Sequence, residues 1–259
     1  MSKRTNMKKV KMDESFIASD GKYILRAKAK QFPRKTALHL LLRAWRRQRA
    51  SITYFWDKEQ AALVAHIKDI YGELPMSTSL SEALQVYTAV RATAKIPGAL
   101  AEVGVYKGGT ARIIASAAGG VKRLHLFDTF GDGLPQPGGY DDSNWKKGSF
   151  KIMESEFEAV KRALANVRDV HFHQGLFPVD TGAAVEGEHF SFVNLDVDIY
   201  QSTKDCLEFF YPRLNKGGII LSHDYHGSLG VKKAFDEFFA NKAEPVVTLS
   251  TSQCLVVKV

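Results

Sequence analysis

Hydrophobic positions in residues 36–95 recur at the spacing of buried helical stripes. Apolar residues at i, i+3, i+4 and i+7 share one face of an α-helix. This spacing describes three stripes before Pro97 and Gly98 break the chain. The stripes are Leu38, Leu41, Leu42 and Trp45; Leu63, Ile67, Ile70 and Tyr71; and Leu80, Leu84 and Tyr87. The pattern predicts an all-helical segment over residues 36–95.

From residue 99 onward, short apolar runs alternate with further helical stripes. Such runs are typical of strands buried on both faces of a parallel sheet. The runs are 99–103, 124–127, 170–174, 190–195 and 219–222. The stripes between and after them are Phe157, Val160 and Leu164; Leu207, Phe210 and Leu214; and Val231, Ala234, Phe235, Phe238 and Phe239. Residues 96–259 therefore predict a doubly wound, mostly parallel α/β domain.

The end of the chain predicts an antiparallel hairpin. Pro245 marks a break, and the apolar runs 246–249 and 254–257 flank a Ser-Thr-Ser turn at 250–252. Two short strands across a polar turn are typical of a hairpin. We therefore expect two antiparallel strands beside the parallel sheet.

Composition supports a folded protein without disulfides. The 259 residues are 45% hydrophobic, which is enough for a substantial core. Cys206 and Cys254 lie in apolar surroundings without metal-ligand spacing, so we expect them in the core of a protein from a reducing compartment. The sequence shows no signal peptide and no apolar run long enough for a membrane span, which predicts a cytoplasmic protein.

The positive net charge of +8 comes from the N-terminal segment. Residues 1–50 hold 15 Lys and Arg against 3 acidic residues, whereas the remainder holds 21 against 25. We interpret residues 1–35 as a basic, loosely ordered arm. A solvated tail or an oligomer contact is the commoner role of such an arm, and an acidic membrane, nucleic acid or a phosphorylated substrate are the alternatives.

The segment AEVGVYKGGT at 101–110 predicts a cofactor site. It joins an apolar run to a glycine-rich turn and a helix start, where free N–H groups and the helix dipole favour a carboxylate. The spacing departs from G-x-G-x-x-G, which argues against a dinucleotide and favours a ligand with a carboxylate, an amine and a ribose, such as S-adenosylmethionine. Asp128 ends the next run and suits the ribose hydroxyls. The alternative is a tight turn with incidental acids.

Acidic residues also follow two later strands. Asp196 and Asp198 follow the run 190–195, and His223 and Asp224 follow the run 219–222. We expect these carboxylates to meet at one rim of the sheet, where a divalent cation would relieve their repulsion. Oxygen ligands favour Mg²⁺ or Mn²⁺, and His223 keeps Mn²⁺ or another transition metal open. Alternatively, Asp196 caps the following helix and Asp224 is a turn residue.

Several of these segments, in the same order, resemble the macrocin O-methyltransferase family. The similar blocks are 102–110, 126–130, 133–135, 174–178, 195–203, 211–214 and 217–218. The resemblance runs from about Ser77 to Phe239, and residues 1 to about 70 are outside it or only weakly similar. It implies the α/β fold of Rossmann-like class I methyltransferases with a C-terminal antiparallel hairpin.

The resemblance also implies transfer of the methyl group of S-adenosylmethionine to a sugar hydroxyl with the help of Mg²⁺. It makes Asp196 and Asp224 candidate metal ligands and Asp198 a further ligand or the general base, and we take Asp198 as the base. His223, beside Asp224, is a third candidate ligand of the metal. The family commonly has two adjacent aspartates before the position of Tyr225, and here the first is His223. The candidate cofactor-binding residues are Glu102, Gly104, Val105, Tyr106, Lys107, Gly108, Thr110, Asp128, Thr129, Phe130, Gly175, Leu176 and Asp196.

A long polar stretch at 131–148 predicts a lid over the acceptor. It is too long for a routine connection between a strand and a helix. Tyr140 and Trp145 offer faces for stacking against a sugar, although such loop aromatics equally serve to anchor a lid. Tyr200, Tyr225 and His226 flank the acidic cluster and complete the candidate substrate-binding residues.

Two other functions fit the same residues less well. The basic arm keeps an RNA ribose 2'-O-methyltransferase open, although nucleic acid is the less expected partner and a small-molecule or glycan acceptor the more expected one. A cofactor-binding module without catalysis is the other alternative, which the cluster of Asp196, Asp198 and Asp224 disfavours. The helical segment at 36–95 is a candidate surface for homo-oligomer formation.

Overall fold

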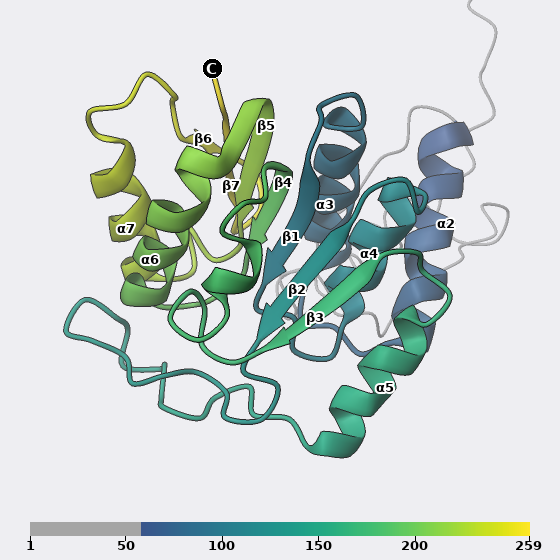
Figure 1. Cartoon of the computed structure of the whole chain (residues 1–259), viewed down its shortest axis with the longest axis horizontal. Coiled ribbons are helices and arrows are strands. Elements are labelled where there is room, and N and C mark those ends of the chain that lie inside the picture. Colours follow the sequence, from purple (N-terminus) through teal and green to yellow (C-terminus); the bar gives the residue numbers. More distant parts are fainter. Residues whose placement is uncertain (1–57) are drawn as a thin grey trace, which may run out of the picture. The chain divides into compact units, whose positions relative to one another are not determined.

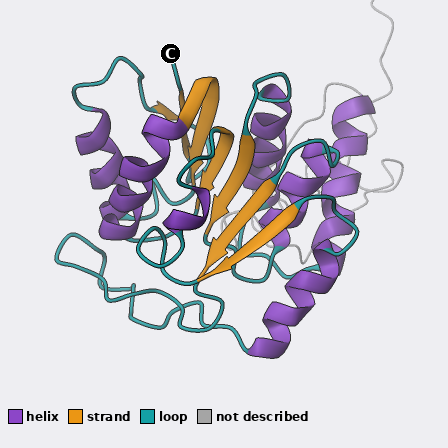
Figure 2. Cartoon of the chain, in the orientation of Figure 1, coloured by secondary structure: helices purple, strands orange, loops and turns teal. Residues whose placement is uncertain are grey.

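Five parallel strands and two antiparallel ones form a single sheet in the order β3-β2-β1-β4-β5-β7-β6 (Figures 1 and 2). The parallel strands are β1 (Ala99–Val103), β2 (Leu124–Asp128), β3 (Val170–Gln174), β4 (Phe190–Leu195) and β5 (Leu214–Ser222). β7 (Cys254–Val257) pairs antiparallel with β5, and β6 (Val247–Thr248) pairs antiparallel with β7. The predicted doubly wound sheet and C-terminal hairpin are confirmed.

The computed structural model describes residues 58–259. The sheet and the helices that cover it belong to the unit 62–259. The basic arm and the helical stripe at 38–45 lie outside the described residues. The second and third stripes form α2 (Lys58–Glu73) and α3 (Leu80–Ala92), as predicted.

Alternate strand residues feed two hydrophobic layers. Leu100, Leu124 and Leu126 face the layer that includes α3, α4 (Gly109–Ala118) and α5 (Glu154–Leu164). Phe127 and Leu195 face the opposite layer, with α6 (Tyr200–Phe210) and α7 (Leu229–Phe239). Because both faces are covered, the central strands read as continuous apolar runs.

One residue of the predicted helical stripes is placed differently. The prediction that puts Leu214 on a helix with Leu207 and Phe210 is wrong, because α6 ends at Phe210 and Leu214 begins β5. A short 3₁₀ turn, η2 (Tyr211–Arg213), separates the two elements and contains Pro212. Proline has no backbone N–H, so the helical hydrogen bonds end there. Another 3₁₀ turn, η1 (Gly182–Val185), precedes β4.

Candidate active site

A pocket of about 270 Å³ opens where the carboxyl ends of β1, β2 and β4 meet. This is the edge at which open α/β sheets bind ligands. Fourteen of the predicted site residues line it, which are Gly104, Val105, Tyr106, Lys107, Thr110, Asp128, Thr129, Trp145, Gly175, Leu176, Asp196, Asp198, His223 and Asp224. The sequence analysis missed other lining residues, which include Pro75, Met76, Ser77, Thr78, Leu134, Pro135, Phe150, Phe177, Val197 and Ser202.

The glycine-rich turn after β1 is held by Asp128 from the end of β2. One carboxylate oxygen, Oδ2, accepts hydrogen bonds of 2.8 Å from the backbone N–H groups of Val105 and Tyr106. The other, Oδ1, accepts one of 2.8 Å from the N–H of Phe130. Asp128 therefore shapes the turn that leads into α4, whatever else it binds in the pocket.

This arrangement predicts the effect of Asp128→Ala. Removal of the carboxylate leaves three backbone donors without their acceptor, so the turn rearranges and binds S-adenosylmethionine at least about tenfold more weakly. Calorimetric titration of the purified variant with the cofactor measures this loss. The exposed Asp132, varied to Ala, serves as the control. An unaltered dissociation constant in Asp128→Ala would refute the role of Asp128 in cofactor binding.

Gly104 lets the turn after β1 approach the loop after β4. Its φ is +89°, and a Cβ atom built there would lie 1.8 Å from the carbonyl oxygen of Asp196. The N–H of Asp196 in turn donates to the carbonyl of Val103 at 2.9 Å. The turn after β1 and the loop after β4 are therefore in direct backbone contact.

Three predicted cofactor-binding residues do not reach the pocket. Glu102 is fully buried within β1, where its Oε1 accepts a hydrogen bond of 3.0 Å from Asn194. Burial raises the pKa of Glu102 well above its usual range. Phe130 is a core residue that stacks on Phe157, with ring centroids 4.0 Å apart. Gly108 faces Val160 at the start of α4.

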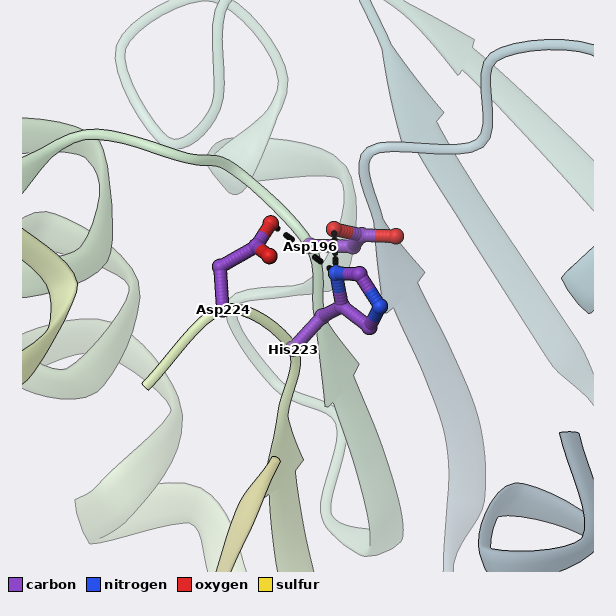
Figure 3. A group of neighbouring side chains, drawn as sticks. All are labelled: Asp196, His223 and Asp224. Carbon is purple, nitrogen blue, oxygen red and sulfur yellow. Dashed lines mark ion pairs between the residues drawn. The ribbon is translucent and has the colours of Figure 1, made fainter. Parts of the chain in front are cut away.

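The predicted acidic cluster does assemble at this edge. Asp196 follows β4, and His223 and Asp224 follow β5, the neighbouring strand (Figure 3). His223 Nδ1 lies 3.2 Å from Asp196 Oδ1 and 2.9 Å from Asp224 Oδ2. The ligand atoms of the three residues all lie within 4.8 Å of one another. Their convergence and chemistry fit a divalent cation.

The same geometry also suits a protonated imidazole. Burial alone would lower the pKa of His223, but the charge of Asp196 and the contacts with Asp196, Asp224 and Glu82 raise it well above its usual range. A protonated ring donates from both nitrogens and cannot coordinate a metal. A cation bound here must therefore displace the proton on Nδ1.

Asp198 lies beside this cluster in the pocket wall and is 7% exposed. Burial, the charges of Asp196 and Asp224, and a hydrogen bond with Asp224 raise its pKa well above the usual range. Asp198 and Asp224 have φ values of +61° and +57°, which are costly for residues with a Cβ atom. Such conformations concentrate at functional sites, where the surrounding structure holds them.

Asp196 does not cap the helix that follows it. The N–H of Tyr200, in the first turn of α6, donates instead to Asp141 of the predicted lid at 2.7 Å. Asp142 accepts a hydrogen bond of 2.9 Å from the N–H of Leu229, in the first turn of α7. The helix-capping alternative for Asp196 is therefore wrong, because Asp141, from the stretch 131–148, takes that position. Asp224 is a turn residue as well as a member of the cluster, since its carbonyl oxygen accepts hydrogen bonds from the N–H groups of Gly227 and Ser228.

Most predicted substrate-binding residues lie away from the pocket. Tyr140 packs against Tyr200, with ring centroids 4.9 Å apart, and Lys233 lies over its ring. These contacts hold residues 131–148 against α6 and α7. Tyr225 is 5% exposed and donates a hydrogen bond to Asp236, whereas His226 is exposed and outside the lining. Trp145 does line the pocket, next to Phe150, which packs edge-on against Tyr106.

Glu82 is a site residue that the sequence analysis missed. It lies on α3, and its Oε2 is 3.4 Å from His223 Nε2. Contacts with His223 and Ser252 outweigh burial and hold the pKa of Glu82 below its usual range. In the sequence, Glu82 is only the fourth residue of a capping box that begins at Ser79. Its contact with His223 depends on how α3 packs on the sheet.

Comparison with known protein families gives a match over most of the chain. Residues 19–250 match the model of the macrocin-O-methyltransferase family (TylF). The match begins at residue 19, well before Ser77, and residues 1–18 lie outside it. Within the part of the chain that the structure describes, no helix combines the length and apolarity that crossing a membrane requires.

Two curated relatives are similar over much of the chain. One is the 8-demethyl-8-(2,3-dimethoxy-alpha-L-rhamnosyl)-tetracenomycin-C 4'-O-methyltransferase of Streptomyces olivaceus, which is 29% identical over 55% of this chain and 63% of its own length. The other is the demethyldecarbamoylnovobiocin O-methyltransferase of Streptomyces niveus, which is 27% identical over 60% of this chain and 63% of its own. The chain thus spans less than two thirds of either relative.

A solved structure shares the fold. The O-methyltransferase NovP superposes with a TM-score of 0.61 at 22% identity, over 71% of this chain and 81% of that one.

Proposed function

The chain belongs to the macrocin-O-methyltransferase family, and from this premise we propose that it transfers a methyl group from S-adenosylmethionine to a hydroxyl of a sugar or glycosylated small molecule. The proposal depends on one observation. The turn after β1 and Asp128 line the same pocket as the cluster of Asp196, Asp198, His223 and Asp224. The names of the two relatives, one of which specifies a rhamnosyl group, support a sugar acceptor.

The donor would lie along the turn after β1. The N-terminus of α4 at Gly109 and Thr110 lines the pocket and favours a carboxylate such as that of the methionine moiety. Asp128, at the end of β2, lies where the ribose hydroxyls of such a ligand are expected. Tyr106, Trp145 and Phe150 form an apolar wall beside it and limit the access of water.

Asp196, His223 and Asp224 would hold a divalent cation, with Mg²⁺ and Mn²⁺ as the first candidates. When bound, the cation would supply positive charge that acidifies an acceptor hydroxyl and offsets the negative charges around Asp198.

In its ionised form Asp198 would accept the proton of the acceptor hydroxyl, and its raised pKa makes it a stronger base. Its carboxyl group lines the pocket beside the cluster, and a buried base next to the reacting oxygen needs no solvent. The remaining task of the protein is to align the hydroxyl oxygen with the methyl carbon and sulfur, and orientation of this kind contributes about 7–11 kcal/mol. The backbone contact between Gly104 and Asp196 fixes the relative position of the two halves of the site.

Thermal unfolding with added ligands tests the proposal. S-adenosylmethionine alone should raise the Tm, because it binds the folded state only, and Mn²⁺ should raise it further. Asp224→Asn should keep the response to S-adenosylmethionine and lose the response to Mn²⁺, because Asp224 is a candidate ligand of the cation and not of the cofactor. A response to the cofactor without any response to Mn²⁺ or Mg²⁺ would contradict the cation site, and no response to the cofactor would contradict the proposed activity.

A further inference from the structure

Glu82 approaches the acidic cluster from outside the sheet. Its Oε2 lies 3.4 Å from His223 Nε2, and the Glu82 and His223 side chains are 12% and 15% exposed. The other ring nitrogen, Nδ1, faces Asp196 and Asp224. His223 therefore lies between a carboxylate on α3 and two carboxylates on the loops after β4 and β5.

The Glu82 carboxylate is itself fixed by two other parts of the chain. The N–H of Ser79 donates to Oε2 at 2.7 Å, which closes the capping box of α3. The hydroxyl of Ser252, in the turn between β6 and β7, donates to Oε1 at 2.6 Å. These contacts restrict Glu82 to a narrow range of positions against His223.

A carboxylate that accepts the Nε2–H of a neutral imidazole fixes the ring orientation and the tautomer. The other nitrogen, Nδ1, then has a free lone pair that can bind a metal. We propose that Glu82 is a positioning residue that holds His223 with Nδ1 directed at Asp196 and Asp224. The cation site would thus be completed by α3, a helix that precedes the sheet. The inference rests on the proposed function for the presence of a cation.

Glu82→Gln is a suitable variant because glutamine also serves in a capping box. It keeps the length of the side chain and removes the charge that faces His223. Glu156→Gln is the matched control, since Glu156 accepts the N–H of Met153 at the start of α5, as Glu82 accepts that of Ser79, and does not contact His223. Both variants would be prepared as the full chain.

The first readout is Mn²⁺ affinity, measured by electron paramagnetic resonance on protein without cofactor. Glu82→Gln should bind Mn²⁺ about 10- to 100-fold more weakly than wild type, and Glu156→Gln should bind it as wild type does. Equal affinities for wild type and Glu82→Gln would overturn the proposal.

A second readout needs no metal. In NMR spectra of ¹⁵N-histidine-labelled protein, wild type and Glu156→Gln should show a His223 Nε2–H signal protected from exchange with water, assigned by its loss in His223→Asn. The signal should disappear in Glu82→Ala, which removes the acceptor that faces Nε2, and its persistence there would overturn the role of Glu82. Glu156→Ala is the control for the lost capping contact and should keep the signal. If wild type binds no Mn²⁺, the cation site fails, while this readout still decides whether Glu82 positions His223.

Discussion

Asp198→Asn is expected to lower turnover by about 10²- to 10⁴-fold, the usual contribution of a general base. The amide has nearly the shape of the carboxyl group but cannot take a proton from the acceptor hydroxyl. The affinity for S-adenosylmethionine should stay the same, because the contacts that shape the cofactor turn come from Asp128. Turnover measured with saturating donor, together with a calorimetric titration of the donor, checks both statements.

The control for this variant is Asp205→Asn. Asp205 lies on α6, outside the pocket, where it accepts a hydrogen bond of 2.7 Å from Gln201. Asp205→Asn should have the same turnover and the same affinity for S-adenosylmethionine as wild type. Retention of full turnover in Asp198→Asn would remove Asp198 as the base and leave only a role in packing beside Asp224.

Gly104→Ala is expected to give the largest loss of stability. The new Cβ atom would lie 1.8 Å from the carbonyl oxygen of Asp196, which is backbone and cannot rotate away, and the φ of +89° is unfavourable for alanine. Backbone strain and overpacking each cost about 1–3 kcal/mol. For a domain of this size the sum corresponds to a fall in Tm of roughly 5–20 °C. Binding of S-adenosylmethionine should weaken as well, since the turn must move.

Thermal unfolding of Gly104→Ala beside Gly187→Ala measures this cost. A Cβ atom at Gly187 has no atom within 4 Å among the described residues, so Gly187→Ala should unfold as wild type does. Equal Tm values for the two variants would show that Gly104 does not lie against the carbonyl oxygen of Asp196.

The strands β1 and β4 were predictable because both are buried along their whole length, and the runs 99–103 and 190–195 coincide with them. The run 170–174 coincides with β3, although this edge strand is only partly buried and contains His171, His173 and Gln174. The meeting of Asp196 with Asp224 also followed from the sequence, because both residues follow neighbouring parallel strands. The meeting of strand ends at one edge of a parallel sheet can be predicted without knowledge of side-chain packing.

Other parts of the site depend on contacts that no sequence pattern contains. Glu102 was expected at the rim, but it lies within β1, where the sheet buries its side chain beside Asn194. Tyr225 was expected near the acceptor, but its ring packs against Phe235 in the core. Glu82 reaches His223 only through the packing of α3. In each case the contact depends on the direction in which one side chain points, and the spacing of hydrophobic residues does not determine that direction.

The hydrogen bonds of Asp141 and Asp142 give residues 131–148, the predicted lid, a second role at two helix ends. Each carboxylate neutralises the positive dipole end of a helix, at α6 and at α7, and those helices begin directly after the loops that carry Asp198 and Asp224. Ligand exchange that lifts residues 131–148 would therefore withdraw both carboxylates together, while the Ser228 hydroxyl would still accept the N–H of Val231 at the start of α7. Release of this one segment would thus change the electrostatic surroundings of two helix ends.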